Sequence, residues 1–148
     1  MRGGIVIVAL ALAACGAGSG EGLDQNGQPL TGGGNAPPVS GLAPTLDSIQ
    51  TNVFNVNCAV PGCHGGTGAQ QGLRLDPGFS AGNLINVHSS QDPNLIRVIP
   101  GDPDGSFLIQ KLDGTQTVGS RMPDGGPYLT TATINVIRQW IQDGAPTQ

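Results

Sequence analysis

The sequence predicts an all-α fold with few helices and long connecting loops, on three observations. Apolar residues recur at helical spacing in residues 45–54 and 131–143, which is the pattern of a helix with one buried face. No stretch shows the apolar–polar alternation typical of a half-buried strand. Gly (25) and Pro (12) make up a quarter of the 148 residues and gather between the periodic segments. Residues 65–83 and 113–128 are therefore expected to be long loops, and loops of that length favour a functional role.

The first and last of these helices carry clear apolar stripes. The first stripe consists of Leu46, Ile49 and Val53, and the last consists of Ile134, Ile137 and Ile141. Trp140 lies beside the last stripe, so its indole is expected to pack in the core. Gly144 and Pro146 then end the helix, because glycine favours the left-handed turn after a helix and proline cannot continue it.

A short helix is expected between these two, over residues 106–112. Either Asp104 or Ser106 could supply its N-cap, since both have a short side chain that can accept a hydrogen bond from a free backbone N–H. Gly114 follows the last apolar residue and is expected to end the helix.

The N-terminal region predicts export and anchoring. Residues 1–15 combine one cation, a short apolar run and small residues before Cys15, which is typical of a signal peptide. The last four resemble a bacterial lipobox, in which the cysteine is lipidated and becomes the mature N-terminus. Ordinary cleavage near Ala13 or Ala14 is the alternative. By that resemblance Gly16, in the position after the cysteine, points to the outer membrane, facing the periplasm or the cell surface.

The next segment, residues 16–44, has the composition of a tether. It contains nine Gly and four Pro among 29 residues, too few apolar groups to offset the entropy of ordering. A flexible chain of this length has an end-to-end distance of roughly 30 Å. The folded domain is therefore expected over residues 45–148.

The charge and composition exclude some functions. The formal net charge is −4 and the six basic residues are scattered along the chain, which argues against nucleic-acid binding because phosphate neutralisation needs clustered cations. Five aromatic residues are few for a core of this size. No catalytic triad, carboxylate pair or phosphate-binding loop stands out.

The chemistry lies in the segment Cys58-Ala-Val-Pro-Gly-Cys63-His64. Two thiols followed directly by a histidine are used for covalent haem attachment, although the usual spacer is two residues and here it is four. A small disulfide loop in an oxidising compartment is one alternative. A zinc site built from Cys58, Cys63 and His88 is another, but it lacks a clear fourth ligand.

A second potential ligand, Met122, lies far along the chain. It precedes Pro123 in a loop, and Gly125 and Gly126 would let the backbone pass close to a flat ligand. A thioether can complete the coordination of a haem iron already held by a histidine. His88 is the alternative distal ligand.

Together these residues give residues 45–145 a resemblance to the mono-haem class I c-type cytochromes, in the bacterial branch with a Cys-x4-Cys-His attachment site. The resemblance rests on the helix leading into Cys58, on Cys58/Cys63/His64, on the loop of Met122 and on the Trp140 helix. It implies a small cytochrome c-like fold wrapped around one covalent haem c. By the same resemblance Cys58 and Cys63 carry the thioethers, His64 is the proximal iron ligand and Met122 the distal one.

The haem propionates would need cations or hydrogen-bond donors. Arg97 and Arg121 are the main candidates, and Arg74 and Lys111 are further ones. Arg97 lies in an apolar run, where an unpartnered charge would be costly.

The resemblance implies an electron carrier that exchanges electrons with redox protein partners and is not an enzyme. One alternative is a catalytic or sensing haem domain, such as a peroxidase subunit or gas sensor, with a labile sixth ligand. The other is a surface lipoprotein without haem, stabilised by a disulfide.

Overall fold

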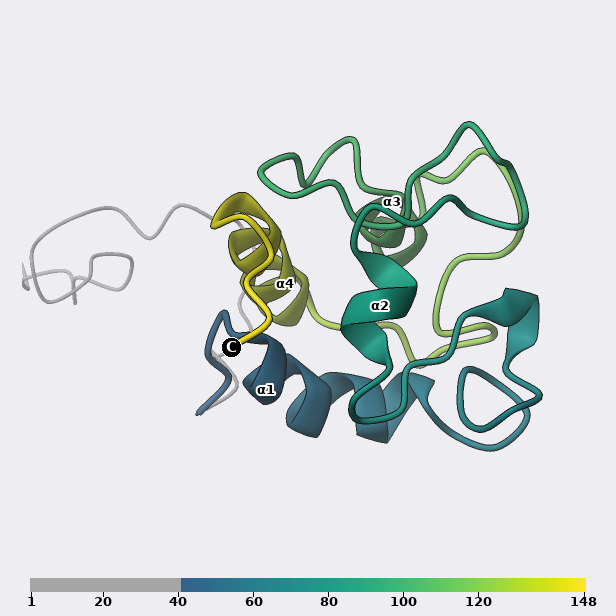
Figure 1. Ribbon diagram of the computed structural model, residues 1–148, viewed down its shortest axis with the longest axis horizontal. Helices are drawn as coiled ribbons and strands as arrows, with labels where there is room; N and C mark the ends of the chain where they lie inside the picture. The colour runs from purple at the N-terminus through teal and green to yellow at the C-terminus, as the bar shows by residue number, and fades with distance from the viewer. Residues whose placement is uncertain (1–40) are drawn as a thin grey trace, which may run out of the picture. The chain divides into compact units, whose positions relative to one another are not determined.

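The computed structural model describes residues 41–148, which fall within one compact unit of the chain. The described elements are, in order, α1 (Leu46–Ile49), the π-helix η1 (Gln50–Cys58), the single 3-10 turn η2 (Gln70–Gly72), α2 (Ser80–Leu84), α3 (Phe107–Asp113) and α4 (Thr131–Gln142) (Figure 1). These residues form isolated bridges but no strand, so the expected all-α class is confirmed for them. No helix within them is long and apolar enough to cross a bilayer.

The predicted signal peptide, with Cys15, and most of the predicted tether lie outside the described residues. The last tether residues, 41–44, already contact the folded part. Leu42 packs against the core, and the Ala43 N–H donates to Ser48 Oγ at 2.9 Å. The folded part therefore begins a few residues before residue 45.

The predicted first helix is confirmed and is longer than expected. Thr45 caps it, since its Oγ1 accepts a hydrogen bond from the Ser48 N–H. After Ile49 the helix continues as the π-helix η1, and it ends when the Ala59 N–H donates to the Phe54 carbonyl, five residues back, at 2.7 Å. The helix thus ends at the predicted haem-attachment cysteine, Cys58.

The two later helices also form where the sequence predicts them. Gly114 ends α3 in the left-handed region at φ 82°, and Thr130 caps α4 through the Thr133 N–H. Ser106 is the N-cap residue of α3, one of the two candidates, but its side chain makes no capping hydrogen bond. The Ser106 hydroxyl instead accepts from the Ile99 N–H at 2.9 Å and donates to the Asp102 carbonyl at 2.7 Å.

One apolar core joins the first helix to α3 and α4, and Figure 1 draws α4 beside α1. Trp140 is fully buried in this core, as expected, and its Nε1–H donates to the Pro146 carbonyl at 2.9 Å. The buried apolar residues are Leu46, Ile49, Val53, Phe54, Leu75, Leu84, Val98, Ile109, Leu112, Ile134, Ile137, Trp140, Ile141 and Ala145.

The expectation that residues 65–83 form a loop throughout is wrong, because the segment contains η2 and the start of α2. A buried polar network holds α2 in place. Ser80 Oγ donates to Gln50 Oε1 at 2.5 Å, and Gln50 Nε2 donates to the Leu75 carbonyl at 2.8 Å. Since α2 has only five residues and includes Gly82, tertiary contacts rather than helix propensity must stabilise it.

Candidate functional site

A pocket of about 650 Å³, including its open mouth, lies between the helices and the long loops. It is lined by Cys58, His64, Gln71, Leu73, Leu75, Leu84, Ser89, Gln91, Arg97, Phe107, Leu108, Lys111, Leu112 and Met122. Three of the four residues predicted to bind haem therefore share one pocket, although they come from separate parts of the chain.

The imidazole of His64 is held in one orientation. Its Nδ1 lies 3.1 Å from the Leu73 carbonyl oxygen, which can only accept, so Nδ1 carries the proton and Nε2 keeps its lone pair. Burial lowers the pKa of His64, more than its hydrogen bond to the Leu73 carbonyl raises it. The neutral form, which binds metals, is therefore favoured near pH 7.

The segment around His64 is fastened to the segment that follows it. The Gln70 N–H donates to the Cys63 carbonyl at 2.7 Å, and the Leu75 N–H donates to the His64 carbonyl at 2.8 Å. Asp76 completes the connection, because its Oδ2 accepts from the Gly66 N–H at 2.8 Å.

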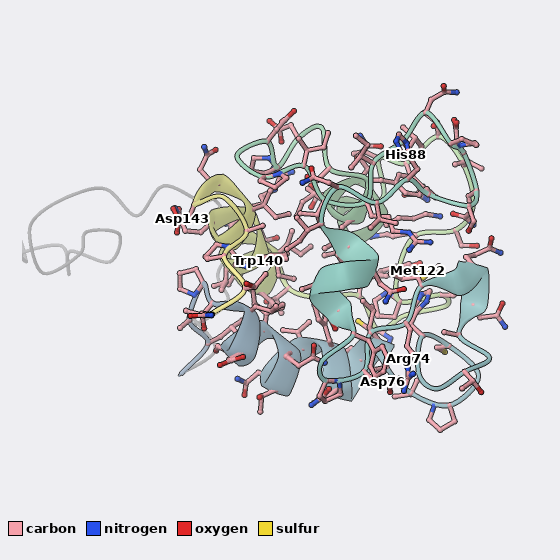
Figure 2. All side chains as sticks on the ribbon, viewed as in Figure 1. Arg74, Asp76, His88, Met122, Trp140 and Asp143 are labelled. Atoms are coloured by element: carbon pink, nitrogen blue, oxygen red, sulfur yellow. The ribbon has the colours of Figure 1, made fainter. Side chains whose placement is uncertain are left out.

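Arg74 supports Asp76 rather than the pocket. Its Nε donates to Asp76 Oδ2 at 2.5 Å, and Figure 2 draws Arg74 and Asp76 side by side. The guanidinium of Arg74 also lies 3.5 Å from the centre of the Phe79 ring. This partner holds the pKa of Asp76 below its usual range.

The turn between the two cysteines is closed by a tight backbone contact at Gly65. A Cβ on Gly65 would lie 2.5 Å from the Ala59 carbonyl oxygen, closer than non-bonded atoms allow. The turn also depends on Gly62, whose φ of 84° is readily adopted only by glycine. These two residues bring His64 back to the end of η1, where its N–H donates to the Cys58 carbonyl at 3.0 Å.

The two thiols occupy different environments. Both are free in the structure. Cys58 lines the pocket, and burial, with a smaller contribution from Cys63, raises its pKa to about 12, so it is a neutral thiol near pH 7. Cys63 is exposed and is the one member of the predicted haem-binding set that does not line the pocket.

Met122 lines the pocket and packs against the core. Its backbone N–H donates to the Lys111 carbonyl at the end of α3, at 2.9 Å. A soft thioether and a neutral imidazole therefore face one apolar pocket, and this donor set suits a haem iron.

Of the predicted cations, Arg97 lines the pocket and Arg121 does not. Arg97 is only 7% exposed, and its two terminal nitrogens donate to the Asn83 carbonyl at 2.8 Å and the Gln71 carbonyl at 3.0 Å. Arg121 instead donates to the Leu112 carbonyl at 2.9 Å and lies 4.1 Å from the centre of the Tyr128 ring.

Lys111 is the second cation that lines the pocket. Burial lowers the pKa of both Arg97 and Lys111, and neither forms an ion pair within residues 41–148. Arg97 and Lys111 are the only lysine or arginine residues among the described lining residues, none of which is acidic, and both donate to backbone carbonyls.

His88 lies elsewhere. It does not line the pocket, its Nδ1 is 2.6 Å from the Pro93 carbonyl oxygen, and Figure 2 shows it well apart from Met122. The structure therefore does not bring together the alternative zinc ligands Cys58, Cys63 and His88. Within the described part of the chain no three His, Cys, Asp or Glu side chains form a group able to hold a metal ion.

Several residues important to the site are not evident from the sequence. The Leu73 carbonyl, which orients His64, gives no signal because every residue has a carbonyl. Gln50, Gln71 and Gln91 are ordinary polar residues in the sequence, and only the fold brings them to the pocket or to its support. Arg138 likewise gives no signal in the sequence, yet it joins α4 to Asp104, before α3, and to Asp113, the last residue of α3, both at 2.5 Å.

Comparison of the chain with protein-family models, curated proteins and solved structures finds no match.

The close approach at Gly65 can be tested with a matched pair of variants. Gly65→Ala should lower the free energy of unfolding by about 1–3 kcal/mol, because the new methyl group has no room. Gly68→Ala is the control, since a Cβ there meets nothing within 4 Å. Chemical denaturation followed by circular dichroism measures both, and equal stabilities would contradict the tight turn.

Proposed function

We propose that this protein is an electron carrier that holds one covalently attached haem c in the pocket, with His64 and Met122 as axial ligands. The observation that supports this most strongly is the convergence of Cys58, His64 and Met122 on one apolar pocket. The first two come from the end of η1 and the turn after it, and the third comes from the loop after α3. The proposed fold is accordingly a small cytochrome c-like one.

The residues present fit this cofactor. The thiol of Cys58 lies in the pocket wall, and Cys63 directly precedes the histidine, so both are proposed to form the thioethers. His64 offers Nε2, because Nδ1 is held by the Leu73 carbonyl. Leucine and phenylalanine side chains supply the apolar walls that a porphyrin ring requires: Leu73, Leu75, Leu84, Phe107, Leu108 and Leu112.

A haem in this site supplies one-electron exchange between ferrous and ferric iron. If His64 and Met122 both bind the iron, they would leave no position on it for a substrate, which favours a carrier over an enzyme. The thioether of Met122 favours the ferrous state and raises the potential.

The propionates of the cofactor would need a cation or hydrogen-bond donor, and the pocket lining includes Arg97 and Lys111. Arg97 is the better of the two main candidates, because it lines the pocket whereas Arg121 stacks on Tyr128 outside the lining. Each terminal nitrogen of Arg97 donates one hydrogen bond to a carbonyl and retains a second N–H for another acceptor.

The proposed address is the outer membrane, through a lipid on Cys15. The chain is acidic overall, which favours redox partners with basic patches at their docking sites. The segment 16–44 would let the domain reach partners at a distance from the membrane.

The proposed covalent attachment predicts the behaviour of the cysteine variants. The double change Cys58→Ala/Cys63→Ala should abolish haem that remains on the denatured protein, because no thioether can form. A pyridine haemochrome assay and intact mass after expression in a host that matures c-type cytochromes measure this. Cys15→Ala is the control and should keep its haem. Haem that survives denaturation in the double variant would contradict the proposal.

Met122→Ala should leave the haem attached but lower its reduction potential by on the order of 0.1 V, a fraction of the roughly 0.8 V range that axial ligands cover. The ferrous variant should also bind carbon monoxide readily. Redox titration and absorption spectra measure both effects, and His88→Ala should match the wild type. If His88→Ala instead lowered the potential and bound carbon monoxide while Met122→Ala matched the wild type, His88 would be the distal ligand.

Cys15→Ser should move the protein from the membrane to the soluble fraction, because the acyl chains alone would hold the mature form. Fractionation and mass spectrometry of the N-terminus measure this. A wild-type protein without fatty acid would favour ordinary signal cleavage.

A further inference from the structure

Lys111 is a buried cation that donates to the loop carrying Met122. It lies in the last turn of α3 and is only 7% exposed. Its ammonium donates to the Val118 carbonyl at 2.8 Å and to the Ser120 carbonyl at 3.2 Å. Burying an ammonium is costly unless hydrogen bonds compensate for the lost water, and these two bonds supply that compensation, beside the Phe107 ring 5.1 Å away.

Two further hydrogen bonds join the same loop to the end of α3. The Met122 N–H donates to the Lys111 carbonyl at 2.9 Å, and Arg121 Nε donates to the Leu112 carbonyl at 2.9 Å. The last carbonyls of a helix have no partner inside the helix, so the loop satisfies them while the helix positions the loop. Lys111 therefore takes part in three of the four bonds.

Gly119 provides the space for the ammonium under the loop. Its φ is 71°, and a Cβ at this position would collide with Lys111 Nζ and would lie 2.7 Å from Gln91 Nε2. A side chain at residue 119 would thus displace the ammonium from the carbonyls on either side of it. The contact between Lys111 and residues 118–120 depends on this glycine.

We propose that Lys111, seated against Gly119, is a positioning residue that keeps the Met122 thioether in the pocket and thereby keeps the sixth coordination position closed to other ligands. This rests on the proposed haem site and adds the element that controls access to it. Without the ammonium, the loop retains the backbone bond of Met122 and the side-chain bond of Arg121. Met122 would then leave the pocket more often, and an external ligand could enter.

Lys111→Met is the first test, because it keeps the length and apolar stem of the side chain and removes its donors. The haem-loaded variant should keep its full haem content and lose part of the absorption band that arises from methionine sulfur bound to ferric iron. Carbon monoxide should bind the ferrous form about tenfold faster or more, since two charge-assisted hydrogen bonds no longer hold the loop. Wild-type spectra and binding rates in this variant would overturn the proposal.

Gly119→Ala is the second test and leaves the lysine in place. It should show the same partial loss of the band and the same faster binding, because the added methyl group displaces the ammonium and also strains the loop backbone at φ 71°. Arg138→Met is the control. It removes a half-buried cation that also binds the end of α3, through Asp113, but does not contact residues 118–122. If the variants only lowered stability, the control would show the same changes. If they instead release the contact between Lys111 and residues 118–120, the control would show neither change.

A measurement that does not depend on the iron separates this proposal from the haem proposal. Amide hydrogen exchange at Met122, and tryptic cleavage after Arg121, should be faster than wild type in Lys111→Met and Gly119→Ala and unchanged in Arg138→Met. Unchanged exchange in both loop variants would overturn the proposed positioning role of Lys111, even if haem is bound. A wild-type protein without haem would overturn the proposed function. The exchange experiment would still show whether Lys111 holds the loop of Met122 in place.

Discussion

The site depends most on the hydrogen bond between His64 Nδ1 and the Leu73 carbonyl. It fixes the ring, leaves Nε2 as the free lone pair, and requires Leu73 to lie beside the turn after η1. That requirement is met because the chain from Gln70 to Leu75 is bonded to the backbone of residues 63 and 64. The bond from Gln50 to the Leu75 carbonyl then connects this arrangement to the first helix, so the core positions the imidazole.

Two buried cations hold the loops of the site by donating hydrogen bonds to their carbonyls. Arg97 donates to the Gln71 carbonyl beside the segment that orients His64, and Lys111 donates to two carbonyls in the loop of Met122. Only 11% of the residues are charged, so the burial of two cations at one pocket is a notable use of them. Loops rich in glycine and proline bury few side chains, and donors that reach their carbonyls supply the rigidity that packing does not.

The sequence predicts the parts of this protein that depend on local patterns. Periodicity predicts α4 and the first helix, glycine predicts the end of α3, and the apolar run around Arg97 predicts that its charge needs partners. The sequence does not predict α2, the bonding of Ser106 or the polar network of Gln50, because each depends on segments distant in the chain. Cys63 shows a further limit, since the motif groups it with Cys58 but only Cys58 lines the pocket.

Because the pocket and the core share residues, binding of the proposed cofactor would be linked to folding of the chain. Leu75, Leu84 and Leu112 belong to the apolar core and also line the pocket. A flat apolar cofactor would cover the partly buried lining residues Leu73 and Leu108, which pack against that core, at about 25 cal/mol for each Å² removed from water. A chain with one Trp and three Phe has few large side chains for that purpose. Because a ligand that binds only the folded state adds its binding free energy to stability, the cofactor would complete the core as well as carry the electron.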